Sequence, residues 1–235
     1  MLLFRGIQLV IVLLSDNMQE MIYIKKHLYM FIQYIHMINK YKHMFMYLDI
    51  LNLLFLNYDS LINVREIARK LHLNPATSSL LVKELIDLGL IKYIESGRSK
   101  ILKLNTENAE LLDFLSIAEI MKKIRFVEQT PFKHFFKMLE EDENKDMIAI
   151  FGSYARGNYS KDSDLDLIIV SDKNLREELP TYLLPIKIHN IQMTKEMFLE
   201  NLKAGNEVIK EIVKNHIIIK GVEIFLQEII KNYGK

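Results

Sequence analysis

The sequence contains no cysteine, which excludes disulfide bonds and metal sites built on thiolates, so cysteine usage says nothing about the compartment. Neither sign of charge is in excess: the chain has 31 Lys and Arg and 30 Asp and Glu, which gives a formal net charge of +1. Such a chain has no overall field that demands a nucleic-acid partner, and that role would need a local surface. Hydrophobic residues are 50% and charged residues 26% of the 235 positions, as in globular chains of one large domain or two small ones.

A hydrophobic run long enough to span a membrane is also missing. Residues 1–14 are apolar, but Arg5 interrupts them and no small-residue cleavage site follows. The apolar part is too short for a membrane-spanning helix and lacks the form of a signal peptide. We therefore expect a cytoplasmic protein that does not take a membrane as its partner.

Residues 1–44 form an N-terminal extension whose role the sequence leaves open. Met, Tyr, Ile and Lys are frequent over residues 15–45, without a clean period. The stretch is either an amphipathic helix that packs on the rest of the protein or an extension from a start codon placed too early. In the second case translation would begin at Met37, Met44 or Met46.

Residues 45–105 have the pattern of three helices followed by a β-hairpin. A strongly apolar helix comes first, and Asn63 then caps a short second helix, with Glu at the third position after it. Asn74 and the proline that follows it mark the start of a third helix. Two strands over residues 90–94 and 100–104, joined by a short turn, complete the pattern.

In the third predicted helix, residues 75–88, we expect leucines to face the core and small polar residues to face outward. The expected inward set is Leu80, Leu81, Leu85 and Leu88, and the outward set is Thr77, Ser78, Ser79 and Lys83. The whole arrangement resembles a winged helix-turn-helix domain, in which the third helix lies in the DNA major groove and the wing touches the backbone. The resemblance implies that the outward set faces DNA, with Arg98 and Lys100 at the tip of the wing.

The charge of this segment gives only weak support for DNA binding. Between Met44 and Asn105 there are eight Lys or Arg and six Asp or Glu, a net charge of +2, which is a small electrostatic footprint. Three interpretations stay open: contact with DNA, contact with another protein or with a second copy in a homodimer, and a scaffold. Residues 106–124 are predicted to form a helical linker to a second domain at residues 125–235.

The motif that carries chemistry begins after a short apolar run, residues 147–151, that predicts a β-strand. Gly152 follows at once and lets a phosphate approach the backbone closely. Ser153 adds a hydroxyl and an amide at the start of a helical turn, where free N–H groups favour an anion. Arg156 lies within the same turn and could add a charge-assisted contact to a nucleotide.

Asp164 and Asp166 belong to the next predicted strand, and ten residues separate Ser153 from Asp164. Their spacing puts both carboxylates on one face of a sheet, while Leu165 and Leu167 point into the core. Two carboxylates beside a phosphate-binding turn suit a hard cation such as Mg²⁺ that bridges carboxylate and phosphate oxygens.

The strand, Gly-Ser and Asp-x-Asp together resemble the polymerase-β-like nucleotidyltransferase superfamily, in particular its minimal members. The resemblance implies that Gly152 and Ser153 contact the triphosphate and that Asp164 and Asp166 bind metal and support catalysis. Active members usually supply a third carboxylate from a later strand, whose position here is held by His189. That histidine is either a substitute proton acceptor or an ordinary polar residue at a strand end. Five other histidines, His27, His36, His43, His134 and His216, show no ligand spacing and are expected to be structural or on the surface.

We therefore expect an α+β protein: an N-terminal winged helix-turn-helix and a C-terminal nucleotidyltransferase domain with a mixed sheet flanked by helices. The resemblance extends to antitoxins of the MntA type, which implies a protein adenylyltransferase that uses ATP and Mg²⁺ to transfer AMP to a tyrosine of a HEPN-type toxin. One alternative is a transcription regulator that binds nucleotide but catalyses weakly. Another is a nucleotidylating enzyme of the aminoglycoside type.

Overall fold

A computed structural model describes residues 43–97, 99–173, 179 and 184–232. The chain divides into two compact units, Met1–Phe45 and Met46–Lys235. The N-terminal extension predicted for residues 1–44 lies almost wholly outside the described residues, so its two interpretations stay open.

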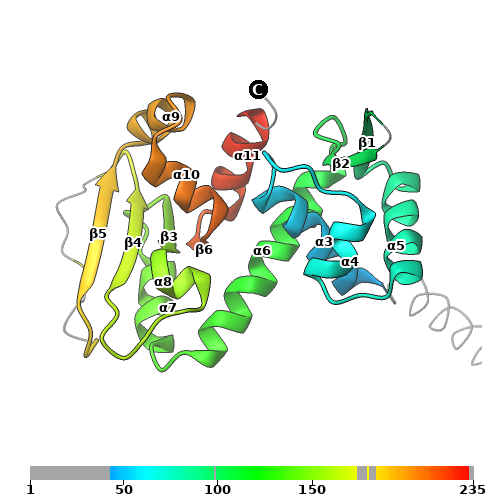
Figure 1. Ribbon diagram of the computed structural model, residues 1–235. Coiled ribbons are helices and arrows are strands. Elements are labelled where there is room, and N and C mark those ends of the chain that lie inside the picture. Colours follow the sequence, from blue (N-terminus) through cyan, green and yellow to red (C-terminus); the bar gives the residue numbers. More distant parts are fainter. Residues whose placement is uncertain (1–42, 98, 174–178, 180–183, 233–235) are drawn as a thin grey trace, which may run out of the picture. The chain divides into compact units, whose positions relative to one another are not determined.

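The first part of the larger unit has the predicted order of three helices and a hairpin (Figure 1). Its elements are α3 (Met44–Leu56), α4 (Val64–Lys70), α5 (Pro75–Asp87), β1 (Ile91–Ser96) and β2 (Ser99–Leu104). The Asn63 side chain accepts hydrogen bonds from the backbone N–H groups of Arg65 and Glu66. Asn74 accepts one from Ala76, with proline at the first position of α5. Both predicted caps are confirmed, because each asparagine satisfies N–H groups that the first helical turn leaves free.

The predicted orientation of α5 is partly wrong. Leu81 and Leu85 are buried as expected, but Leu80 and Leu88 are each 48% exposed. Ser78, expected to face outward, is 0% exposed. The reason is the helical period: positions 78, 81, 82 and 85 share one face, and Leu80 is out of phase with them.

The second part packs helices against one mixed sheet (Figure 1). Strand β4 pairs antiparallel with β3 and parallel with β5, and β6 pairs antiparallel with β3, giving the order β5-β4-β3-β6. The fold class predicted from the sequence is confirmed. The elements are α6 (Glu110–Gln129), α7 (Lys133–Glu141), β3 (Met147–Phe151), α8 (Gly152–Arg156), β4 (Leu165–Val170), β5 (Ile188–Met193), α9 (Lys195–Lys203), α10 (Glu207–Lys214), β6 (Ile217–Lys220) and α11 (Val222–Asn232).

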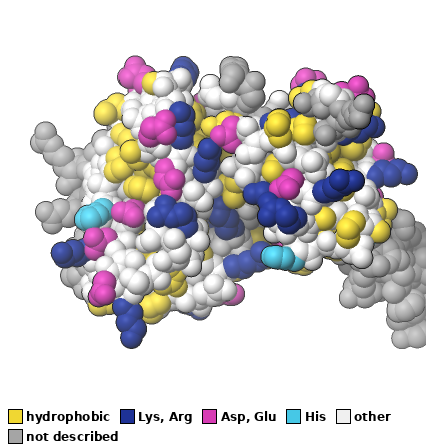
Figure 2. Space-filling view, in the orientation of Figure 1, with side chains coloured by type: hydrophobic (Ala, Val, Ile, Leu, Met, Phe, Trp, Pro, Cys, Tyr) yellow, Lys and Arg dark blue, Asp and Glu magenta, His cyan; other side chains and the backbone are white. Residues whose placement is uncertain are grey.

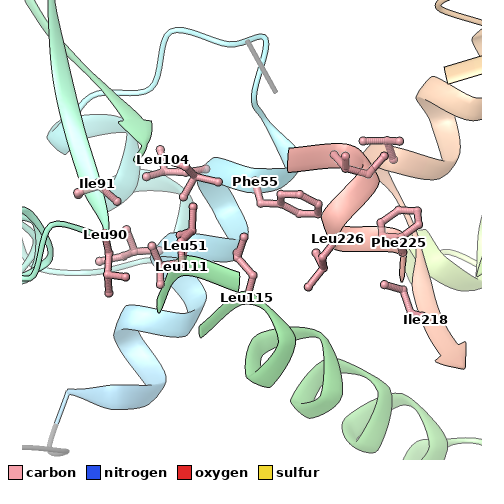
Figure 3. Close-up of a cluster of buried hydrophobic side chains, with 14 of the residues drawn as sticks. Leu51, Phe55, Leu90, Ile91, Leu104, Leu111, Leu115, Ile218, Phe225 and Leu226 are labelled. Carbon is pink, nitrogen blue, oxygen red and sulfur yellow. The ribbon is translucent and has the colours of Figure 1, made fainter. Parts of the chain in front are cut away.

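Both faces of the sheet are covered, because alternate residues of each strand point to opposite sides. On one face Leu165 and Leu167 pack with Phe135 of α7. On the other face Ile168 belongs to the same buried cluster as Phe225 of α11. The buried cluster that contains Ile168 and Phe225 continues into the core of the first part. Figure 3 shows side chains of this cluster from both parts. The labelled members include Leu51, Phe55, Leu104, Leu115, Ile218, Phe225 and Leu226.

Helix α6 joins the two parts. It carries a buried charged residue, Glu119, whose exposure is 1%. Its carboxylate lies 3.1 Å from Lys122 Nζ and 3.3 Å from His216 Nε2. His216 Nδ1 faces the carbonyl oxygens of Ile212 and Val213 at 2.9 and 3.1 Å. His216 is therefore a structural residue, as predicted. The linker boundary predicted at residue 124 falls inside α6.

Candidate nucleotide-binding site

The site is built around the point where β3 ends. Gly152 has a φ of +68° and is buried, and a Cβ atom at this position would lie 2.0 Å from Asp166 Oδ2. Only glycine fits both the backbone conformation and the space. The turn that follows, α8, has five residues and ends at Gly157 in the left-handed conformation, so the predicted strand and helical turn are confirmed. Because α8 is so short, an anion would be bound by the free N–H groups of this turn, and a helix dipole would contribute little.

The two predicted carboxylates lie against this turn. β4 begins at Leu165, so Asp164 comes immediately before it, and Asp166 pairs with Phe151 at the end of β3. The Asp164 and Asp166 side chains are 36% and 28% exposed, whereas Leu165 is fully buried on the other face. The structure therefore brings Gly152, Asp164 and Asp166 together, as the spacing predicts.

The charge of the two carboxylates suits a cation. Burial raises the pKa of Asp166, and the nearby charge of Asp164 adds to the rise against the opposing charges of His189 and Arg156. A hard cation would relieve this repulsion, and its preferred ligands are oxygens such as these. No three Asp, Glu or His side chains among the described residues are grouped closely enough to hold a metal by themselves. A cation here would therefore take further ligands from a triphosphate and water.

His189 occupies the position on β5 that faces Asp166 in the parallel β4–β5 register. Its Nε2 lies 3.5 Å from Asp164 Oδ2 and its Nδ1 lies 3.7 Å from Asp166 Oδ1. The ring is 67% exposed. Strand β5 brings no carboxylate to this position, so an imidazole lies against the carboxylate pair instead.

Arg156, the last residue of α8, forms an ion pair with Glu211 of α10. Its charge also acts on Asp166 and lowers the pKa of that carboxyl, against the stronger effect of burial. Arg156 therefore lies in the turn where the sequence places it, with an acidic partner that the sequence did not indicate, and its contact with a nucleotide stays a prediction. The local sequence could not predict the contact with Glu211, because Glu211 follows Arg156 by 55 positions.

Each of the two parts matches a known family model. Residues 132–233 match the family model of the nucleotidyltransferase domain. Residues 48–92 match that of the winged helix-turn-helix DNA-binding domain. The chain joins a winged helix-turn-helix to a nucleotidyltransferase domain.

A protein of Methanocaldococcus jannaschii that carries the name "Putative protein adenylyltransferase" is 28% identical over 99 residues. The match covers 42% of this chain and 98% of that protein. No solved structure matches the chain significantly.

The loop between the Gly-Ser turn and the carboxylates of the nucleotidyltransferase domain is held by contacts that the sequence analysis missed. The rings of Tyr154 and Tyr159 stack with centroids 4.2 Å apart and an interplanar angle of 7°. The Asn158 N–H donates to the Ser153 carbonyl at 3.1 Å, and the Ser160 N–H donates to Ser163 Oγ at 2.8 Å. These contacts order the loop between Ser153 and Ser163. The two tyrosines, five positions apart, were the feature of the sequence that could have predicted this stacking.

The winged helix-turn-helix presents only part of the predicted DNA-contacting set. Ser79, Lys83 and Lys100 are exposed, and Thr77 is partly buried. Ser78 is wrongly placed in that set, because its buried side chain points into the core. The Lys100 ammonium lies 4.5 Å from the centre of the Tyr93 ring, a cation–π contact within the wing. Arg98 lies outside the described residues.

The visible surface carries mixed charge. Figure 2 shows Lys and Arg side chains interspersed with Asp and Glu side chains, without one basic field over the face in view. Across the described residues, no helix has the length and apolar character needed to cross a membrane.

Proposed function

We propose that the nucleotidyltransferase domain transfers AMP from Mg²⁺–ATP to the hydroxyl group of an acceptor, a tyrosine of a partner protein. The name of the Methanocaldococcus relative supports a protein acceptor. The resemblance to antitoxins of the MntA type favours a HEPN-type toxin as that partner. Fold alone does not determine an acceptor, so the partner is identified by experiment.

The observation that carries this proposal is the contact between the Gly-Ser turn and the carboxylates. Gly152 packs so closely on Asp166 that no side chain fits between them. A triphosphate on the turn would therefore lie beside Asp164 and Asp166, the carboxylates that would hold a hard cation. Bound there, Mg²⁺ would stabilise the charge that develops on the phosphates.

In the proposed reaction the acceptor hydroxyl oxygen bonds to the α-phosphorus of ATP. The bond from the α-phosphorus to the bridging oxygen breaks, pyrophosphate leaves, and the hydroxyl proton passes to a base or to water. Gly152 and Ser153 hold the phosphates with backbone N–H groups. Arg156 adds a charge-assisted contact. Asp164 and Asp166 would hold the cation beside the phosphates.

The proposal is tested by mass spectrometry of the product. The purified full chain is incubated with Mg²⁺, ATP and the protein encoded beside it, and the partner is searched for an AMP-bearing tyrosine. A modified tyrosine, absent when Asp164 and Asp166 are both replaced by Ala, is expected. An unmodified partner, with ATP still bound by the protein, would favour the nucleotide-sensing alternative.

A regulator that binds DNA is the second candidate, and the surface of α5 favours it. The first turn of α5 has no acidic residue, and Ser79 and Lys83 are exposed on it. In winged helix-turn-helix proteins the N-terminal residues of this helix reach the base edges. Retention of an upstream DNA fragment, changed by ATP, would support this function. Absence of retention even at low salt would exclude it.

A further inference from the structure

The guanidinium of Arg156 is held by a helix that is distant in the sequence. Arg156 ends the five-residue helix α8, and its Nη1 donates to Glu211 Oε1 on α10. The two side chains are 41% and 40% exposed. Without that contact, Arg156 would be a long side chain at the end of a short helix, with many rotamers open to it.

Glu211 itself is carried by a well-anchored element. The opposite face of α10 is buried in the core through Ile209, Ile212 and Val213. One turn after Glu211, Lys214 Nζ lies 2.7 Å from Asp59 Oδ2, in the loop after α3. Asn215 Nδ2 donates to the same Glu211 oxygen at 3.5 Å. Glu211 is therefore a fixed acceptor beside Arg156.

We propose that Glu211 is a positioning residue, which holds Arg156 in the orientation that receives the triphosphate. The inference rests on the proposed function, because it assigns a role toward the same nucleotide. A guanidinium has five N–H donors, and the bond to Glu211 leaves others free for phosphate oxygens. Orientation in advance lowers the entropy lost when the ligand binds.

A competing effect has the opposite sign. The Glu211 carboxylate could repel the triphosphate or compete for the guanidinium. Its charge is paired and partly in water, where exposed ion pairs interact weakly and salt screens them. The strength of the ion pair itself limits the positioning effect to a few-fold change in Kd, and the screened repulsion is smaller.

The test is a double-mutant cycle on nucleotide affinity. Isothermal titration of the full chain with Mg²⁺ and α,β-methylene-ATP gives Kd for the unsubstituted protein, Arg156→Ala, Glu211→Ala and the double variant. Glu207→Ala is the matched control, since Glu207 lies on the same helix and pairs with Lys210 at 2.8 Å. Thermal unfolding of each variant checks that α10 remains folded.

We expect Arg156→Ala to raise Kd about ten-fold, the loss of one hydrogen bond to a charged group. Glu211→Ala should raise Kd about three- to five-fold through lost ordering of one side chain, and it should have no further effect once Arg156 is absent. Glu211→Gln keeps an acceptor oxygen and should restore most of the affinity. Glu207→Ala should leave Kd unchanged.

An unchanged or lowered Kd in Glu211→Ala would overturn the positioning role, as would additive effects in the double variant. Failure of the unsubstituted protein to bind the analogue is a different result. It would overturn the proposed function itself.

Discussion

His189 Nδ1 lies 3.7 Å from Asp166 Oδ1, across the parallel pair formed by β5 and β4. The relationship places an imidazole where related active enzymes are expected to supply a third carboxylate. It makes this position the clearest difference between the site and the pattern that it resembles.

Replacement of His189 by Asp should raise the rate of AMP transfer, because a carboxylate in this position can accept the proton of the attacking hydroxyl. A well-placed base contributes about 10²-fold or more, and we expect about ten-fold here, since the new side chain is shorter than histidine. The rate of partner labelling at saturating Mg²⁺–ATP is the measurement. His189→Asn is the size-matched control, and a rate in His189→Asp no higher than in that control would count against this account.

Gly152→Ala should abolish nucleotide binding, and Gly157→Ala should not. Both glycines have positive φ values, +68° and +72°, but only at Gly152 would a Cβ collide with Asp166. At Gly157 no atom lies within 4 Å of the added Cβ, so the cost is that of a left-handed non-glycine residue, about 1 kcal/mol. ATP titration and urea unfolding of both variants separate the two effects. Equal loss of binding in the two variants would show that backbone strain alone is responsible.

The buried Glu119 should make stability depend on pH in the acid range. Burial raises the pKa of Glu119, but the charges of His216 and Lys122 outweigh burial and lower the pKa from 4.5 to about 2. Because the folded pKa lies below the unfolded one, this stabilisation is complete above about pH 4.5 and is lost as the pH falls toward 2. Burial and the nearby charge of Lys122 lower the pKa of His216, against the opposing charge of Glu119.

Glu119→Gln should therefore lower the free energy of unfolding by about 3 kcal/mol at neutral pH, because it leaves the partly buried Lys122 ammonium without its counter-charge and the buried His216 ring without its carboxylate neighbour. The variant should also show a flatter loss of stability between pH 4.5 and 2. Urea unfolding at a series of pH values provides the comparison. Parallel pH profiles for the two proteins would remove Glu119 as the cause.

If the winged helix-turn-helix binds DNA, Lys83→Ala should weaken binding about equally for all sequences and reduce the salt slope by about 1. The exposed side chain of Lys83 would contact phosphate. Lys210→Ala on α10 is the control for loss of one exposed charge. Fluorescence anisotropy at several salt concentrations measures both quantities, and an unchanged slope would exclude a phosphate contact by Lys83.

The sequence was sufficient where the signal is local. The sequence predicts the caps Asn63 and Asn74 and the Gly152–Ser153 turn, because the contacts that define each of them lie within a few residues. Asp164 and Asp166 follow from the two-residue period of a strand. Ser78 and Leu80 were misplaced because a polar or apolar type was weighed more heavily than helical phase.

Contacts between elements distant in the sequence could not be predicted in this way. The pairs Arg156–Glu211 and Glu119–His216 form only when α8 meets α10 and α6 meets β6. The position of His189 could be anticipated from the family pattern. Its contact with both carboxylates depends on the register between β4 and β5.

The most direct test of the central claim is a comparison of two labels. The full chain and its partner protein are incubated with Mg²⁺ and ATP labelled at either the α- or the γ-phosphate, beside the variant in which Asp164 and Asp166 are both Ala. We expect the α-label on the partner, no γ-label, and neither label with the variant. Transfer of the γ-label, or α-labelling that persists in the variant, would contradict nucleotidyl transfer at this site.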